Sequence, residues 1–513
     1  MTTTLNYGST SLDPELDQAF ESALHHARTQ VPDALGHVIA GDTAPHGEVF
    51  ERRDPTDPSR VVARAHAATQ DVIDRSVDAA RAAGRQWRSV SAAERAGALR
   101  AAKSGFLDQM ITIAATISAE TGKSRIEALA EAQESADLIE HYCAQMELNN
   151  GFVTPLRPTA TDTTTDVLRP YGVFAVLAPF NFPVALAVNM AAAALVTGNT
   201  VAIKPSDKTP RSTALAAQIL AEALPAGVLN LIHGGAQTGR MLVESRVDGV
   251  AFTGSAEVGW SIIRGFGAGA YAKPVLAEMG GSNPAIVMAT ADLDDAVEGI
   301  VRSAYGFSGQ KCSATRRVVV ERGVHDELVR RLQARVEQIV VGDPASAAVF
   351  MGPVIDENIA ARVASALQTA RADGATVFST AIPDGAGHFV SPTLVMGLPR
   401  GHRLTRDELF APVVTVTAVD GIDEALAEAN AVDYGLSAGI FSSVAEETDR
   451  FLDEIEAGVV YVNRREGATT GAWPGLQSFC GWKASGSSGK GGLGPWYLPG
   501  FMREQSRTVS ARR

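Results

Sequence analysis

The stretch from Pro170 to Ile203 carries no charged side chain and is long enough to cross a lipid bilayer. Proline and glycine alone are tolerated in membrane helices, but asparagines interrupt this stretch as well. Its pattern therefore predicts a buried strand over residues 172–178, a buried helix over 183–197 and a second buried strand over 200–204. We expect no membrane insertion.

The same alternation of short apolar runs and helical segments continues along the chain. A first block reaches about residue 286, and the alternation restarts at about residue 283 and continues to about residue 462. The strands expected in the first block are 174–178, 201–204, 228–233, 250–253 and 275–278. Such alternation is typical of parallel sheets covered by helices on both faces. Two blocks predict two α/β domains with a cleft between them.

The segments before and between these blocks are less regular. Residues 1 to about 60 are polar and rich in Pro and Asp in part, so we expect an irregular lead-in. Residues 71–146 show helical spacing, with capping-box patterns at 91–94 and 124–127 that predict two helix starts. Residues 151–168 are rich in Thr and Pro and predict either a linker or an extended strand pair.

Composition excludes several classes of protein. The formal net charge is −13, which gives no global field attractive to nucleic acid. The three cysteines, Cys143, Cys312 and Cys480, cannot form a disulfide framework and indicate a reducing compartment. The first residues have neither the basic start nor the apolar core of a secretory signal, so we expect a cytoplasmic protein. No cysteine or histidine pair has zinc spacing, so we expect no metal site.

Several short segments carry the chemistry of the chain. They are Pro179-Phe180-Asn181-Phe182-Pro183, Lys204-Pro205, Phe252-Thr253-Gly254-Ser255, Glu278-Met279-Gly280-Gly281, Gly309-Gln310-Lys311-Cys312-Ser313 and Asp407-Glu408-Leu409-Phe410-Ala411-Pro412. Each is weak alone, but in this order they resemble the aldehyde dehydrogenase superfamily from about residue 60 to the C-terminus. That resemblance implies an aldehyde-dehydrogenase-like α/β fold with two parallel-sheet domains, one of them a Rossmann-like cofactor domain, and a small bridging β element.

Oxidation of an aldehyde to an acid needs a soft nucleophile, a donor for the oxyanion and a base for water. A thiolate at Cys312 can be the nucleophile, and the adjacent Lys311 could lower its pKa; a lone cysteine is otherwise a small buried apolar residue. Asn181 offers an amide donor in an apolar turn, or simply forms that turn. Glu278 is a candidate general base, or a solvated carboxylate at a strand end. The resemblance implies the catalytic role for all three.

The resemblance also implies a nicotinamide cofactor. Gly254 and Ser255 would meet its pyrophosphate at a helix N-terminus, although an ordinary N-capped helix explains them as well. Lys204 and Asp207 would contact the adenosine ribose, and a carboxylate at that position repels a 2′-phosphate, so NAD is favoured over NADP. The family positions the nicotinamide ribose and ring with residues that correspond to Glu408 and Phe410.

Residues 303–314 and 463–481 resemble the 1-pyrroline-5-carboxylate dehydrogenase branch of the superfamily, which acts on L-glutamate γ-semialdehyde in proline breakdown. That branch holds the α-amino acid head of the substrate with residues beside the nucleophile and with a glycine-containing loop that can form an anion nest. The residues implied here as substrate-binding are Lys311, Ser313, Gly471, Ala472 and Phe479. The alternatives are another small anionic semialdehyde, succinic or succinylglutamic, and a non-catalytic protein with this fold.

The resemblance finally implies a division of the chain. Residues 1–148 and 168–280 would form the NAD-binding domain and residues 281–465 the catalytic domain. Residues 149–167 and 484–513 would bridge subunits of a homo-oligomer. The expected partner is a small aldehyde, with no nucleic acid and no membrane.

Overall fold

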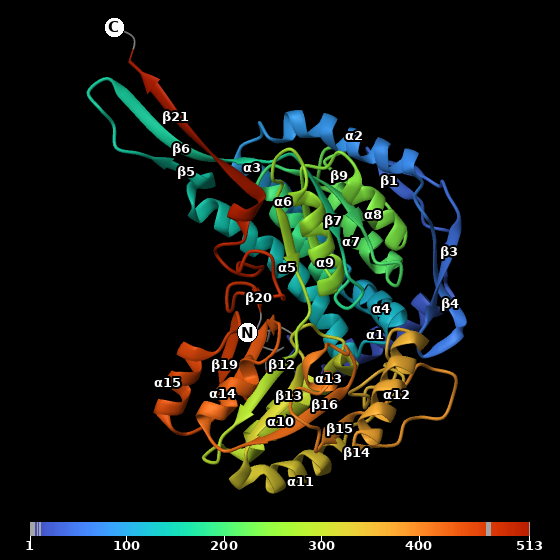
Figure 1. Cartoon of the computed structure of the whole chain (residues 1–513). Coiled ribbons are helices and arrows are strands. Elements are labelled where there is room, and N and C mark those ends of the chain that lie inside the picture. Colours follow the sequence, from blue (N-terminus) through green and yellow to red (C-terminus); the bar gives the residue numbers. More distant parts are fainter. Residues whose placement is uncertain (1–5, 8, 10–11, 468–472, 512–513) are drawn as a thin grey trace.

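The computed structural model describes residues 6–7, 9, 12–467 and 473–511. Two seven-stranded sheets, each with helices packed on its faces, form the body of the molecule (Figure 1). Each sheet has its own core. Two clusters of buried apolar side chains pack against the first sheet and two against the second, and a smaller fifth cluster lies near the edge of the second sheet. The predicted α/β class is confirmed.

The first sheet has the strand order β11-β10-β7-β8-β9-β1-β2. Its strands are β11 (Val275–Glu278), β10 (Gly249–Thr253), β7 (Val173–Leu177), β8 (Thr200–Lys204), β9 (Leu229–Leu231), β1 (His37–Ile39) and β2 (Asp42–Ala44). The first five run parallel, and β1 is antiparallel to both of its neighbours. The chain moves outward from β7 to β9 and then crosses back to β10, on the other side of β7. Open α/β sheets bind ligands in the crevice that such a reversal of strand order creates.

Helices α2 (Gln70–Trp87), α6 (Ala185–Val196), α7 (Pro210–Glu222), α8 (Ala236–Glu244) and α9 (Ala256–Gly267) belong to this first unit. The charge-free stretch forms β7, α6 and β8, and every residue of these two strands is buried, as is nearly every residue of the helix. This buried strand–helix–strand unit is the one that the sequence predicts. Within the described part of the chain, none of the helices has both the length and the apolar character needed to cross a membrane.

The second sheet has the order β14-β15-β16-β13-β12-β18-β19 and is parallel except for β14. Its strands are β14 (Thr376–Ser379), β15 (Thr393–Met396), β16 (Val413–Val419), β13 (Thr315–Glu321), β12 (Asn283–Val287), β18 (Ser437–Phe441) and β19 (Val459–Val462). Its helices are α10 (Leu293–Tyr305), α11 (His325–Val336), α12 (Glu357–Ala372), α13 (Arg403–Arg406), α14 (Ile422–Asn430) and α15 (Ala445–Glu454).

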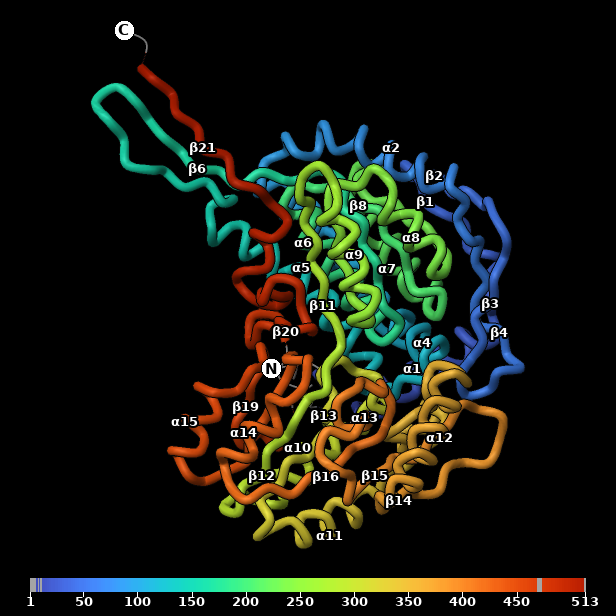
Figure 2. The backbone as a smooth tube through the Cα atoms, in the orientation of Figure 1, coloured from blue at the N-terminus to red at the C-terminus, as the bar shows by residue number. Residues whose placement is uncertain are grey.

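Smaller elements complete the fold. Strands β5 (Val153–Pro155), β6 (Asp162–Pro170) and β21 (Met502–Ser510) form an antiparallel arm that projects from the body (Figure 2). Of the two predictions for residues 151–168, the extended strand pair is therefore confirmed. The remaining pieces are β17 (Tyr434–Gly435), β20 (Trp482–Lys483), η1 (Asn150–Phe152), η2 (Gly306–Gly309), η3 (Arg322–Val324) and η5 (Leu498–Phe501).

The expected irregular lead-in is wrong. Helix α1 (Pro14–Thr29) begins at the Asp13 cap, whose carboxylate accepts from the Glu15 N–H at 2.9 Å. Strands β3 (Val49–Asp54) and β4 (Asp57–His66) form a hairpin. Aspartates and prolines that suggested irregular chain instead cap a helix and close this tight turn, where the Asp54 carboxylate accepts from the Thr56 N–H at 2.8 Å.

The predicted helical region of residues 71–146 is confirmed as α2, α3 (Ala92–Asp108), α4 (Met110–Thr121) and α5 (Arg125–Leu148). The capping box at Ser91 and Glu94 forms with both reciprocal bonds. Ser124 likewise precedes α5, but its hydroxyl donates to the Glu127 carboxylate at 3.3 Å and makes no cap bond to the backbone. Helix α5 lies beside the candidate site, because its residues Glu134 and Leu138 line the cavity described below.

Candidate functional site

A cavity of about 80 Å³ lies between the two sheets. Glu278 reaches it from the end of β11 in the first sheet, and Cys312 from the turn that precedes β13 in the second. The residues that line it are Tyr7, Glu134, Leu138, Phe182, Ala185, Leu186, Asn189, Thr253, Glu278, Met279, Lys311, Cys312, Ser313, Phe479, Gly492 and Leu493. The structure thus brings the predicted nucleophile and the predicted base to one cavity.

Cys312 is partly buried, and its backbone is fixed by hydrogen bonds from the Asn283 side chain. The Asn283 side-chain amide donates to the carbonyl oxygens of Cys312, at 2.7 Å, and of Ala314, at 2.9 Å. Burial raises the pKa of the Cys312 thiol to about 12, and the negative charges of Glu408 and Glu278 add to this. The thiol is therefore the favoured form in the ligand-free cavity.

The expectation that Lys311 lowers the pKa of the Cys312 thiol is wrong. The Lys311 ammonium forms an ion pair with Glu127 of α5, so its charge is compensated by a residue distant in sequence. It also lies 5.8 Å from the centre of the Tyr7 ring. Adjacent residues in a turn point in different directions, and the partner that each one finds is set by the tertiary fold.

Glu278 has a carboxyl group with unused hydrogen-bonding capacity. Its Oε2 is buried and has no hydrogen-bond partner among the residues that the structure describes. Burial raises the pKa of Glu278 well above its usual range, while a backbone hydrogen bond from Gly481 lowers it by less. A buried carboxyl with a free oxygen and a raised pKa is typical of a general base or acid.

Asn181 lies in the loop between β7 and α6 and is 4% exposed. Its side-chain oxygen accepts from the Phe182 N–H at 3.1 Å, and its backbone oxygen accepts from the Lys123 ammonium at 2.6 Å. With the oxygen engaged, the amide NH₂ is the end of the side chain left to act as a donor. Phe182 lines the cavity, whereas Asn181 is not among the lining residues, so its oxyanion role stays a prediction.

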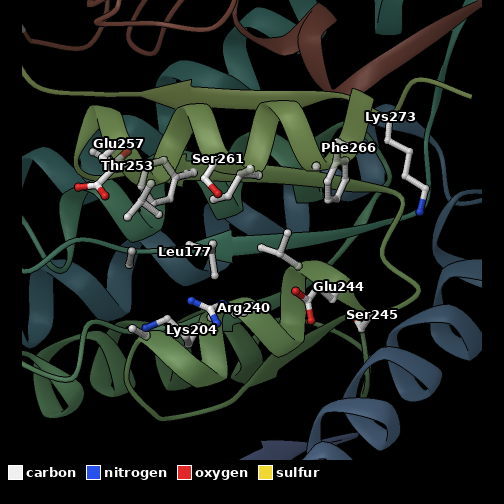
Figure 3. A pocket seen from close by; sticks show the side chains of 18 of the residues that line it. Leu177, Lys204, Arg240, Glu244, Ser245, Thr253, Glu257, Ser261, Phe266 and Lys273 are labelled. Atoms are coloured by element: carbon white, nitrogen blue, oxygen red, sulfur yellow. The ribbon is translucent and has the colours of Figure 1, made fainter. Parts of the chain in front are cut away.

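A second, larger cavity of about 950 Å³ lies at the carboxyl ends of β7, β8 and β10, between α8 and α9 (Figure 3). Lys204, Asp207, Gly239 and Arg240 line one side, and Thr253, Glu257 and Ser261 line the other. We call it the groove. Thr253 lines both the groove and the smaller cavity, so the two spaces meet at the end of β10. This is the crevice expected where the strand order reverses.

Lys204 and Asp207 lie in the groove as the sequence predicts. The Lys204 ammonium donates to the carbonyl oxygens of Pro205, at 2.5 Å, and Gly234, at 3.1 Å. Its stem packs over Gly239, where an added Cβ would lie 3.4 Å from the lysine Cε. Burial lowers the pKa of Lys204 to about 8, against the opposing effect of Asp207.

The other predicted cofactor residues do not line the groove. Ser255 is the N-cap of α9 and accepts from the Val258 N–H at 3.4 Å, while Gly254 packs against the Phe252 ring. Glu408 accepts from the Gly281 N–H at 3.0 Å, and the Phe410 ring lies 5.8 Å from the Phe180 ring. Their contacts with a cofactor stay predictions.

Three of the predicted substrate residues, Lys311, Ser313 and Phe479, line the cavity together with Cys312. The other two, Gly471 and Ala472, lie outside the described residues. No cluster of His, Cys, Asp or Glu suited to a metal ion occurs in the described parts of the chain.

One face of α5 carries buried carboxyl groups that the sequence motifs do not indicate. Glu127, Glu131 and Glu134 recur at helical spacing, and all three are buried. Burial raises the pKa of Glu134 to about 8, and its carboxyl group accepts from the Tyr7 hydroxyl at 2.5 Å. Buried carboxylates on an alanine-rich helix could have been suspected from their spacing. Nothing in the sequence near Tyr7 indicates that it lines the cavity.

Comparisons with known proteins agree with this geometry. The model described as "Aldehyde dehydrogenase family" matches residues 43–506. The 1-pyrroline-5-carboxylate dehydrogenase of Geobacillus thermodenitrificans is 35% identical over 96% of both chains. The 1-pyrroline-5-carboxylate dehydrogenase 2 of Bacillus subtilis is 35% identical over 96% of this chain and 97% of its own.

Solved structures give the same result. The 1-pyrroline-5-carboxylate dehydrogenase from Thermus with bound NAD superposes with a TM-score of 0.93 at 32% identity and covers 98% of both chains. The betaine aldehyde dehydrogenase from Staphylococcus aureus in complex with NAD+ has a TM-score of 0.89 at 26% identity, covering 96% of this chain and 98% of that one.

Proposed function

The chain belongs to the aldehyde dehydrogenase family, and from that premise we propose that it oxidises L-glutamate γ-semialdehyde to L-glutamate with NAD as the hydride acceptor. One observation carries the proposal: Cys312 and Glu278 line the same cavity, and Thr253 lines both this cavity and the groove. The names of two similar relatives support this aldehyde, the open-chain form of 1-pyrroline-5-carboxylate.

The groove fits a dinucleotide in size and chemistry. A volume of about 950 Å³ is ample for such a ligand. Lys204 and Asp207 offer a donor and an acceptor to the hydroxyls of a ribose. NAD, when bound, supplies the acceptor for a hydride. Because Thr253 lines both spaces, the reactive end of a dinucleotide bound in the groove would lie beside the smaller cavity.

The protein side of the reaction follows from the cavity. The Cys312 thiol first loses its proton to solvent. The sulfur then forms a bond to the aldehyde carbon, and the carbonyl electron pair moves to the oxygen, for which Asn181 and the Cys312 N–H are the proposed donors. Loss of hydride from the carbon leaves a thioester on Cys312. Glu278 then takes a proton from water, the resulting hydroxide adds to the thioester, and the carbon–sulfur bond breaks to release the acid.

A panel of aldehydes tests the substrate. We expect kcat/KM with NAD to be at least about tenfold higher for L-glutamate γ-semialdehyde than for succinic semialdehyde, succinylglutamic semialdehyde or propanal, since tenfold needs only ~1.4 kcal/mol of selective binding. NADH absorbance gives the rates. Faster turnover of succinic semialdehyde would reject the proposed substrate, and no NADH from any aldehyde would favour a non-catalytic protein.

Cofactor choice is a separate proposal, which rests on the Asp207 carboxylate in the groove. Asp207→Asn keeps the shape of the side chain and removes its charge. We expect the ratio of kcat/KM with NAD to that with NADP to fall by about tenfold, because the repulsion of a 2′-phosphate is lost. An unchanged ratio would show that Asp207 does not discriminate between the two cofactors.

The division into domains and the assembly also stay proposals. Residues 149–167 contain β5 and most of β6, and residues 484–513 contain β21, which is exposed along all its residues after Met502. An exposed strand edge is a ready site for pairing with another chain. We therefore infer a homo-oligomer bridged by the arm, and we keep the cytoplasm as the expected location.

A further inference from the structure

Lys123 and Glu131 form an ion pair that is shut off from solvent. The Lys123 ammonium lies 2.5 Å from a Glu131 carboxylate oxygen, and both side chains are 0% exposed. Removing two charges from water is costly, and their mutual attraction compensates only when further hydrogen bonds satisfy the remaining valences. The remaining hydrogen-bond partners of Lys123 and Glu131 therefore show what the ion pair holds in place.

Those partners lie in the loop before α6 and at the first residue of that helix. The Lys123 ammonium donates to the Asn181 backbone oxygen at 2.6 Å. Glu131 accepts from the N–H groups of Val184, at 2.9 Å, and Ala185, at 3.3 Å. The pair thus holds the loop from residue 181 to residue 185 at both ends. It does so from α4–α5, a part of the chain outside the first sheet.

The loop has no anchor of this kind in its own sequence. Helix α6 begins without a side-chain cap, because the charge-free stretch supplies no acceptor at Val184. The first N–H groups of a helix need acceptors and favour negative charge. Glu131 provides both from the neighbouring helix.

Lys123 also contacts two aromatic rings, one from the Asn181 loop and one from the segment before Cys312. Its ammonium lies 3.7 Å from the centre of the Phe182 ring and 4.6 Å from the centre of the Phe307 ring. Phe182 follows Asn181 and lines the cavity, while Phe307 belongs to η2, just before the turn of Cys312. A cation between two aromatic faces attracts both.

We propose that Lys123 and Glu131 are positioning residues that fix the Asn181 loop, and with it the oxyanion donor, relative to the nucleophile. This rests on the proposed function, which gives Asn181 that role. Because hydrogen-bond donors must lie close to the position that the oxyanion will occupy, a loop that shifts by a fraction of an ångström loses stabilisation of the transition state without losing the aldehyde.

The decisive variant is the double replacement Lys123→Met with Glu131→Leu. Breaking a buried pair by removing one partner leaves an uncompensated charge, whereas replacing both by apolar residues is often neutral for stability. Glu131→Gln, which keeps the acceptor oxygen and loses the charge, is the second variant. Thermal unfolding shows whether each variant is folded.

Three rates separate positioning from a structural role. We expect kcat for the aldehyde to fall about 30-fold in the double variant, a part of the ~10²–10³-fold that loss of one oxyanion donor costs. Hydrolysis of 4-nitrophenyl acetate, which passes through a similar oxyanion, should fall equally. Alkylation of Cys312 by iodoacetamide forms no oxyanion, so its rate and the KM for the aldehyde should stay within about threefold of the wild-type values.

Combination with Asn181→Ala gives the sharpest result. If the pair acts through Asn181, the double replacement should cost less than about threefold further in that background, because coupled residues are not additive. Fully multiplicative losses, a kcat within about threefold of wild type, or a parallel fall in the alkylation rate would each overturn the proposal.

Glu140→Gln is the matched control. Glu140 lies on the same helix, α5, but pairs with Arg100 at 3.0 Å and Lys103 at 3.2 Å on the outside of the molecule. It should leave all three rates unchanged, and an equal loss would overturn the proposal. The ester arm requires neither NAD nor the semialdehyde, so it tests the pair even if another aldehyde proves to be the substrate.

Discussion

Cys312→Ala is expected to lower NADH formation by about 10⁴-fold or more, because the sulfur forms the covalent bond on which every later step depends. Ser313, the next residue in the chain, also lines the cavity, but its hydroxyl is far less reactive than a thiol at neutral pH. The measurement is NADH absorbance under saturating aldehyde and NAD.

Two controls separate chemistry from folding. Cys312 does not line the groove, so the dissociation constant for NAD, measured by calorimetry, should stay within about twofold. Cys143→Ala removes a thiol that is buried elsewhere and donates to the Ala96 carbonyl oxygen at 3.4 Å, so it should leave kcat close to wild type. A Cys312→Ala enzyme that keeps a tenth of the activity would show that the sulfur is not the nucleophile.

The parts of the fold that the sequence predicts well are those in which local pattern and burial agree. The charge-free stretch could form only buried elements, and it forms β7, α6 and β8 close to the predicted bounds. The structure of a segment can be predicted from its sequence when its local preference agrees with the global fold.

The N-terminal strands could not be predicted in the same way. Strand β1 has three residues and pairs with β9, which lies far along the chain. A three-residue strand carries no periodicity, and its edge position depends on a partner that the local sequence does not show. In the arm, extended strands could be predicted for residues 151–168, but the local sequence does not show that β6 pairs with β21, which lies more than 300 residues further along the chain.

In the candidate site, too, residues in sequence motifs could be predicted, and contacts set by the tertiary fold could not. Cys312, Glu278, Lys204 and Asp207 lie in distinctive motifs, and the structure places each of them in one of the two spaces. Lys311 lines the cavity as predicted, but its effect on the Cys312 pKa does not follow from its adjacent position in the sequence. Its compensating charge, Glu127, appears in the sequence as part of a helix cap and becomes a partner of Lys311 only in three dimensions.

Glu278→Gln is expected to lower steady-state kcat by about 10²–10⁴-fold, the usual contribution of a general base. Hydrolysis of the thioester is the step that needs this base, and the earlier steps do not. Rapid mixing should therefore show a burst of about one NADH per active site, followed by the slow steady rate, because the thioester accumulates.

The dependence of kcat on pH tests whether Glu278 acts as the base. Burial raises the pKa of Glu278, and only the ionised carboxylate accepts a proton from water, so wild-type kcat should rise with pH through that raised pKa and be lost below it. Glu278→Gln should abolish this rise in the steady rate. A rise that remains in the burst rate belongs to Cys312, whose pKa is also raised, to about 12. If no burst occurs, Glu278 is required before hydride leaves the substrate, and its proposed role would move from the water to the thiol.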